Sequence, residues 1–165
     1  THAVGDSAHA AHARYFRPRA APRIFEDIKV GNTARSEMVV TKLGAVYCAR
    51  MRGDDNPINF DNEEARDSFL GELIPHGLYI SSSVSAILGT ELPGKGTIYR
   101  RQEVDFLAPV RFGDKITTTV KVTSKNNKRR FVYLDCLWTN QVGVKVIEGK
   151  AVVWLPPPGV KRKKT

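Results

Sequence analysis

Residues 78–90 of this 165-residue chain carry no charged side chain, although charged residues make up 26% of the sequence. Within this stretch the apolar residues Ile80, Val84 and Ile87 recur at helical spacing, and Gly89 supplies a stop signal. A helix without charge on any face is typically buried on most sides. Its serines have small side chains, so we expect the serine-rich face of the helix, including Ser85, to pack tightly under a sheet.

After this helix the sequence alternates between apolar and polar residues, which is typical of half-buried strands. The alternation predicts four strands, at residues 97–106, 115–123, 131–140 and 144–155. Two runs are each expected on one face of a strand: Ile116, Thr118, Val120 and Val122, and then Val132, Leu134, Cys136 and Trp138. Prolines at residues 156–158 end the last strand, since proline cannot extend a ladder. One antiparallel sheet curled around one buried helix, an α+β fold, accommodates both patterns.

The region before the central helix predicts a further strand and two helices. A strand is expected at residues 34–40, followed by a helix at residues 42–52 that Thr41 caps. Four of its side chains are expected to face inward: Leu43, Val46, Tyr47 and Met51. Asp61 and Glu64 have the spacing of a capping box that opens a short helix ending at Phe69.

Composition limits the class of protein. Hydrophobic residues make up 41% of the chain, and no apolar run approaches the length that spans a bilayer. Cys48 and Cys136 are too few for a disulfide framework or a zinc site, and we interpret them as buried free thiols. Three histidines near the start, His2, His9 and His12, have no cysteine or carboxylate cluster beside them, so we predict no metal site.

The basic charge is concentrated at the two ends of the chain. Four arginines against one aspartate give residues 1–23 a net charge of +3, and residues 158–165 carry +4, which leaves +2 of the total +9 for residues 24–157. We predict one domain at 24–157 between two tails, and the first tail resembles part of a mitochondrial transit segment. Basic arms commonly contact phosphate or acidic partners. The expected contact residues are Arg14, Arg17, Arg19, Lys161, Arg162, Lys163 and Lys164. By contrast, the basic residues near the predicted turn at 125–130 are interpreted as solvated surface.

Several motifs resemble the MaoC-like hot-dog family. They are His76-Gly77, the serine at position 82, the run LPGKGTIY at residues 92–99 and the run FLAPV at residues 106–110. The resemblance covers residues 25–156 and implies a single hot-dog domain. Members of this family include (R)-specific enoyl-CoA hydratases and mitochondrial 3-hydroxyacyl-thioester dehydratases.

In that family a motif of the form Asp-x-Asn-Pro-x-His supplies the catalytic Asp and His. The resemblance places Asp54 at the Asp, Asn56 at the Asn, and Asn59 where the His should be. An imidazole exchanges protons near neutral pH, whereas a carboxamide forms hydrogen bonds without useful proton affinity. We therefore expect impaired or absent hydratase chemistry, with Asp54 as the remaining base. The alternative interpretation of residues 53–59 is a structural Asx-type turn without chemistry.

Other parts of the family site are present. The resemblance implies that the backbone N–H of Gly77 polarises a thioester carbonyl. We interpret His76 as a hydrogen-bonded residue that shapes the turn, with a catalytic or substrate-binding role as the alternative. Ser82 matches a serine near the family's site, or is a small packing residue. The glycines at residues 93–96 do not have the spacing of a phosphate-binding loop.

The functional hypothesis is a MaoC-like homologue that is a structural or acyl-thioester-binding subunit of a larger mitochondrial assembly, with RNA or acidic proteins as partners of its tails. The alternative is an active (R)-specific enoyl-thioester hydratase or 3-hydroxyacyl-thioester dehydratase, and a third hypothesis is a thioester sensor without turnover. The resemblance implies a homodimer or heterodimer of hot-dog domains. It also implies acyl-CoA or an acyl carrier protein thioester as ligand and no other cofactor.

Overall fold

The computed structural model describes residues 24–60 and 62–159. The 3-10 helix η1 (Phe25–Asp27) comes first, and four α-helices, a second 3-10 helix and five strands follow in chain order: β1 (Thr33–Val39), α2 (Lys42–Arg52), η2 (Pro57–Asn59), α3 (Asn62–Asp67), α4 (Gly77–Ser81), α5 (Ser83–Thr90), β2 (Ile98–Phe106), β3 (Lys115–Asn126), β4 (Phe131–Thr139) and β5 (Lys145–Trp154). All five predicted strands are present within a few residues of their expected bounds.

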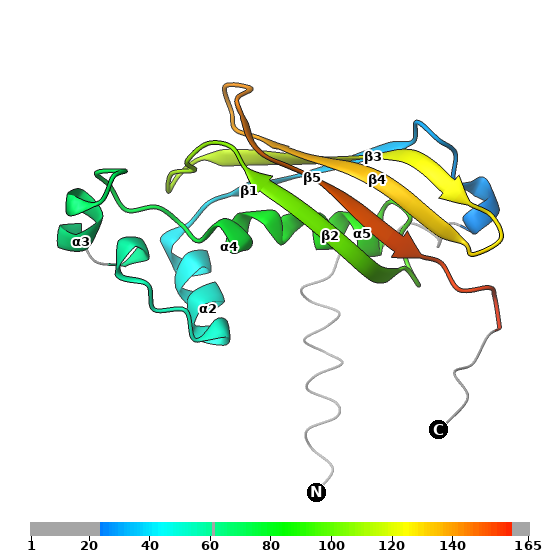
Figure 1. The fold of residues 1–165 in the computed structure, drawn as a ribbon, viewed down its shortest axis with the longest axis horizontal. Coiled ribbons are helices and arrows are strands. Elements are labelled where there is room, and N and C mark those ends of the chain that lie inside the picture. The colour runs from blue at the N-terminus through cyan, green and yellow to red at the C-terminus, as the bar shows by residue number, and fades with distance from the viewer. Residues whose placement is uncertain (1–23, 61, 160–165) are drawn as a thin grey trace, which may run out of the picture.

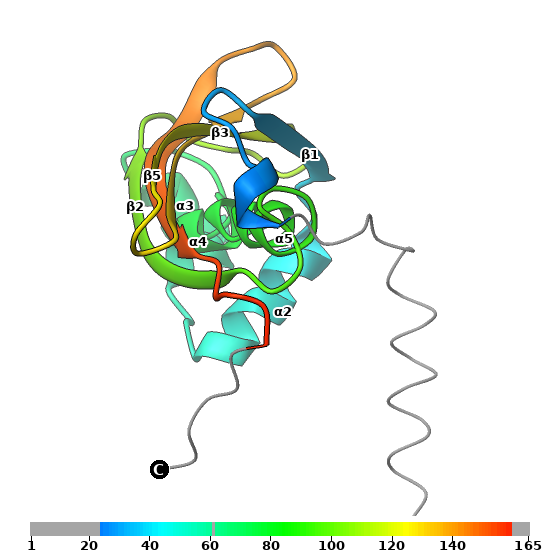
Figure 2. The same ribbon diagram turned by 90° about the vertical axis from the view of Figure 1, so that its right-hand side faces the viewer.

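The strands form one antiparallel sheet in the order β1-β3-β4-β5-β2. The sheet lies over α4 and α5 in Figure 1, and in Figure 2 it curls around α5. Alternate residues of β3 and β4 face the helix, and the eight side chains expected on their inner faces are all buried. The predicted α+β hot-dog arrangement is therefore confirmed.

The central helix differs from the prediction in two ways. It is divided into α4 and α5 at Ser82, whose hydroxyl donates a hydrogen bond to the Tyr79 carbonyl at 2.7 Å. Such back-bonding from serine to the helix backbone often bends a helix. The second difference is that Ser85 is exposed, so the expected packing of Ser85 under the sheet is wrong. The buried face instead carries Ile80, Val84, Ile87 and Leu88.

Helix α2 is also rotated relative to the prediction. Leu43, Tyr47 and Met51 are exposed, whereas the small residues Ala45 and Ala49 are buried, so the expected inward face is wrong. Small side chains let α2 approach α4 closely, and the Tyr79 hydroxyl lies 2.2 Å from the position that a Cβ of Gly44 would occupy. The predicted cap is confirmed, since the Thr41 hydroxyl accepts a hydrogen bond from Gly44 N at 3.1 Å.

The short helix α3 ends at Asp67, two residues before the predicted end, and the Phe69 side chain is fully exposed. Asp61, the expected cap of this helix, lies outside the described residues. Within the described residues, no helix combines the length and apolar character that crossing a bilayer requires.

The N-terminal segment is held against the sheet by two basic side chains. The Lys125 ammonium donates to the carbonyls of Phe25 and Ile28 at 2.7 and 2.5 Å and lies 4.2 Å from the Phe25 ring centroid. Arg130 donates to the Leu155 carbonyl and to Glu26, which holds the pKa of the Glu26 carboxyl below its ordinary value. The interpretation of these two residues as solvated surface is wrong, because the chain start supplies acceptors for them.

Candidate active site

Asp54 lies on the loop that leaves helix α2. Gly53 ends the helix with a φ of 67°, a left-handed conformation that glycine adopts without a Cβ clash, and Asp54 N donates to the Ala49 carbonyl at 3.1 Å. One carboxylate oxygen of Asp54 accepts a hydrogen bond from Asn56 N at 3.4 Å. The Asp54 side chain is 45% exposed, so the carboxylate is only partly buried.

Asn59 lies at the end of η2 and is buried. Its side-chain N–H donates to the Ile74 carbonyl at 2.6 Å. This bond ties η2 to the extended segment at residues 74–77, which leads into α4. Asn59 therefore uses one of its two N–H donors to position the segment that carries His76 and Gly77.

His76 brings the loop and the central helix together. Its Nε2 lies 3.3 Å from Oδ2 of Asp54, and its ring centroid lies 5.3 Å from that of Phe60. The side chain is only 6% exposed, and neither ring nitrogen has a hydrogen-bond partner among the described residues. The interpretation of His76 as a hydrogen-bonded turn residue is therefore wrong. The Asp54 carboxylate lies 3.3 Å from Nε2 without forming a hydrogen bond to it.

Gly77 is the first residue of α4, where a backbone N–H has no partner within the helix. The Phe106 ring occupies the space beside it, and a Cβ built on Gly77 would lie 2.6 Å from the ring. Only glycine fits at this position without moving the ring. Phe106 thus closes over the start of α4.

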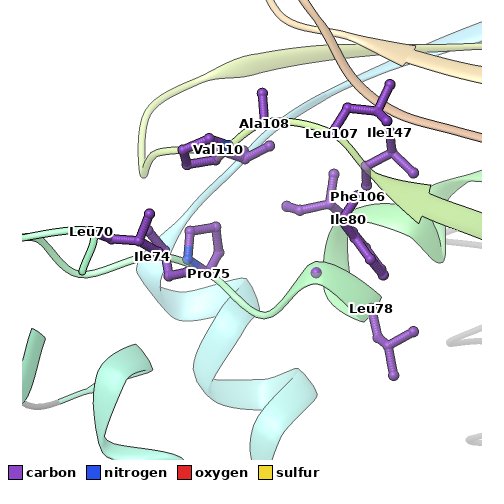
Figure 3. A pocket seen from close by; sticks show the side chains of 12 residues that line it. Leu70, Ile74, Pro75, Leu78, Ile80, Phe106, Leu107, Ala108, Val110 and Ile147 are labelled. Carbon is purple, nitrogen blue, oxygen red and sulfur yellow. The ribbon is translucent and has the colours of Figure 1, made fainter. Parts of the chain in front are cut away.

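Gly77 is one of the residues that line an apolar cavity of about 440 Å³. Figure 3 shows its lining, in which side chains from the segment before α4 face those of the loop after β2 and Ile147 of β5. The lining residues are Leu70, Ile74, Pro75, Gly77, Leu78, Ile80, Phe106, Leu107, Ala108, Pro109, Val110 and Ile147. The cavity is suited to a hydrocarbon chain.

Asp54 lines a second cavity, of about 430 Å³, together with Ala49, Arg50, Asp55 and Phe60 among others. The segment at residues 74–77 runs between the two: Pro75 and Gly77 line the apolar cavity, and the intervening His76 side chain reaches Asp54. The Asp54 carboxylate thus approaches the residue that precedes Gly77, the first residue of α4. A carboxylate can act as a base, and a helix-start N–H can act as a hydrogen-bond donor.

The remaining predicted residues are not at this centre. Ser82 is exposed, bonds to the Tyr79 carbonyl and is not among the residues that line either cavity. The seven basic residues of the tails, and His2, His9 and His12, lie outside the described residues. Among the residues that the structure does describe, no group of three His, Cys, Asp or Glu could hold a metal ion.

Sequence reasoning did not identify the cavity wall formed by Leu70 and Ile74. They follow α3 in an irregular segment without periodicity, so no pattern marks them. Phe106 was part of the FLAPV motif, but its contact with Gly77 depends on the fold. The contact between Asp54 and His76 likewise joins residues 22 positions apart, which no local pattern reports.

Comparison with known proteins identifies the family. The chain is 38% identical over 135 residues to the (R)-specific enoyl-CoA hydratase of Rhodospirillum rubrum, covering 82% of this chain and 93% of that protein. It is 29% identical over 132 residues to the mitochondrial 3-hydroxyacyl-[acyl-carrier-protein] dehydratase of Arabidopsis thaliana, covering 78% of each chain.

Among solved structures, the (R)-hydratase from A. caviae involved in PHA biosynthesis is similar to this chain with a TM-score of 0.75 at 33% identity. That similarity covers 79% of this chain and 99% of the solved one. The sequence profile of the MaoC like domain matches residues 26–135. The chain belongs to the MaoC-like family of hydratases and dehydratases and has its hot-dog fold.

Proposed function

We propose that this protein binds acyl thioesters and interconverts their trans-2-enoyl and 3-hydroxyacyl forms through Asp54, more slowly than a domain with a complete motif. The observation that carries the proposal is the 3.3 Å approach of His76 to Asp54, because it puts the motif carboxylate beside the residue that precedes Gly77. The apolar cavity that begins at Gly77 is suited to the acyl chain. The names of the hydratase and dehydratase relatives support the same reaction class.

The low rate follows from position 59. The Asn59 carboxamide has no useful proton affinity, and its N–H donates to the Ile74 carbonyl. General acid–base catalysis typically contributes a factor of about 10² to 10⁴, so loss of the motif imidazole leaves room for a residual rate. We therefore place this chain between a full hydratase and a protein that only binds thioesters.

The test compares crotonyl-CoA hydration by the natural protein and by the Asn59→His and Asp54→Asn variants. Butyryl-CoA binding, measured by calorimetry, separates occupancy from turnover. We expect weak hydration by the natural protein, a much higher rate for Asn59→His and no hydration by Asp54→Asn. Butyryl-CoA binding should be retained in all three proteins. Failure of all three proteins to bind butyryl-CoA would overturn the proposal and favour a structural role.

We also propose a dimer of two such domains, identical or related. Strand β2 is an edge of the sheet, and the apolar side chains of Ile98, Phe106 and Leu107 along it are exposed. Exposed apolar side chains on a free sheet edge favour pairing with another chain. Light scattering of the purified protein tests this directly: a monomer at micromolar concentration would contradict it.

A location in mitochondria and membership of a larger, RNA-containing or acidic assembly are further proposals. They are supported by the basic charge of residues 1–23 and 158–165 and by the name of the plant relative. A chain lacking residues 1–23 and 159–165 should keep the thermal stability of the natural protein and lose salt-sensitive co-migration with large mitochondrial particles. Unchanged co-migration of the trimmed chain would contradict the proposed role of the tails.

A further inference from the structure

Residues 24–165 contain a single histidine. Three of the four histidines of the chain lie in residues 1–23, and the fourth is His76. In the fold, this one imidazole lies with Nε2 3.3 Å from the Asp54 carboxylate, the acid of the motif whose own histidine position holds Asn59. The domain therefore keeps one imidazole beside the motif aspartate, delivered from a different segment of the chain.

The surroundings of His76 are unusual for a residue with only a packing role. Its side chain is more than nine-tenths buried, and both ring nitrogens lack a hydrogen-bond partner among the described residues. A buried polar group without a partner destabilises the fold, and such groups in native proteins often have a functional reason. The partly exposed Asp54 carboxylate lies 3.3 Å from Nε2, so a proton held between the two groups would give each of them a partner.

We propose that His76 is the proton-transfer partner of Asp54 and takes over the task of the imidazole that position 59 lacks. This inference rests on the hydratase function proposed above. It assigns His76 as a positioning residue, because its buried ring acts on the substrate only through the Asp54 carboxylate.

The reaction needs only the thioester and water. As the water oxygen forms a bond to C3 of the enoyl group, one O–H bond of the water breaks and Asp54 takes the proton. The π electrons between C2 and C3 move toward C2 and the thioester carbonyl oxygen. C2 then takes the proton back from Asp54, which leaves the carboxylate as it began. Between the two transfers, the His76 ring stabilises the proton on Asp54 by sharing it at Nε2.

Asn59 and Phe60 hold the histidine in place. The Asn59 bond to the Ile74 carbonyl fixes the segment two residues before His76, and the Phe60 ring packs against the imidazole at an interplanar angle of 51°. Phe60 also lines the Asp54 cavity, so the ring that packs against the imidazole lies in the same cavity wall as the carboxylate. The His76 side chain is thereby aimed at Asp54.

The kinetic test uses the full chain and crotonyl-CoA. His76→Gln should lower kcat by about 10²-fold or more with KM little changed, while Asp135→Asn, a change to an exposed carboxylate on β4 outside both cavities, should keep the natural rate. The double variant His76→Gln with Asn59→His should regain activity, because it returns an imidazole to the motif position. A purely structural role of His76 would not be rescued in this way.

The outcomes separate this inference from the proposed function. If His76→Gln keeps the natural rate while Asp54→Asn loses it, the proposed hydratase stands and the role of His76 is wrong. If neither the natural protein nor Asn59→His turns over crotonyl-CoA, the proposed function fails and the inference fails with it. Ring-nitrogen NMR of His76 gives a second measurement that does not need a folded His76 variant. Its Nε2 signal should change in Asp54→Asn and not in Asp135→Asn, and an unchanged signal in Asp54→Asn would overturn the inference.

Discussion

The indole N–H of Trp138 donates a hydrogen bond to the Ser83 hydroxyl at 2.9 Å and so joins the C-terminal end of strand β4 to helix α5. The same hydroxyl lies 2.7 Å from the hydroxyl of Thr118 on β3 and 2.8 Å from the Ile80 carbonyl. Trp138 and Thr118 are both fully buried. One serine therefore satisfies two buried polar groups of the sheet and fixes the rotation of the helix beneath it.

Ser83→Ala should destabilise the protein by about 1–3 kcal/mol, because it leaves the Trp138 N–H and the Thr118 hydroxyl buried without this partner. Ser85→Leu is the matched control two residues along the same helix. Ser85 is exposed, so its substitution should change the free energy of unfolding by no more than about 0.5 kcal/mol. Urea unfolding of the three proteins measures both effects, and equal losses for the two variants would contradict this role of Ser83.

Gly77→Ala should strongly reduce crotonyl-CoA hydration, because the new methyl group would lie 2.6 Å from the Phe106 ring and displace it or the start of α4. Gly89→Ala is the control, since nothing lies within 4 Å of the Cβ it would add and alanine favours the helix. Phe106→Leu combined with Gly77→Ala should recover part of the rate by making room for the methyl group. Full activity of Gly77→Ala alone would show that the ring moves freely.

Lys125→Met should destabilise the protein by about 1–2 kcal/mol, since the Phe25 and Ile28 carbonyls lose a charged donor while the apolar stem is kept. Lys128→Met, at the exposed tip of the same hairpin, serves as the control. Thermal unfolding compares the two, and hydrogen exchange of residues 25–31 shows whether the loss is local. Equal melting temperatures for both variants would mean that Lys125 does not hold the segment.

Alkaline pH should weaken the fold through Cys136 and Tyr99. Burial raises the pKa of the Cys136 thiol from its ordinary 9.0 to about 12, and burial also raises the pKa of Tyr99 from 10.0 to about 12. The unfolded chain ionises first, so it binds fewer protons than the folded protein above pH 9.0, and stability falls as pH rises from there toward about 12.

Urea unfolding at a series of pH values measures this dependence. Cys136→Ala should make the decline shallower, even though the cavity it leaves lowers stability at every pH. An equally steep decline in Cys136→Ala would show that the thiol does not contribute.

The sequence predicted the sheet well because alternation directly reports which residues face a core, as the buried side chains of β3 and β4 illustrate. It predicted the direction of helices less well. In α2 the larger apolar residues Leu43 and Tyr47 suggested the inner face, but close packing against Tyr79 admits only small side chains such as Ala45.

The family motif located Asp54 and Gly77, yet the features that connect them were not visible in the sequence. The Asn59 bond to the Ile74 carbonyl and the approach of His76 to Asp54 both join segments that are distant along the chain. Such contacts depend on how the loop after α2 folds back on the central helix. Local propensity does not encode that path.

The close fit of Tyr79 over Gly44 has a consequence for how the domain loses activity. Helices α2 and α3 lie to one side of the curled sheet (Figure 1). Asp54 lies on the loop that follows α2 and Asn59 lies in η2, while Gly77 is the first residue of the central helix α4. The Tyr79 contact, the Asn59 bond and the His76 approach connect α2, η2 and the loop between them to the start of the central helix. Loss of these contacts would separate Asp54 and Asn59 from Gly77, while the sheet and its core would stay intact. A substitution at one of these contacts is therefore expected to lower activity while the protein stays folded, and thermal unfolding alone would not reveal it.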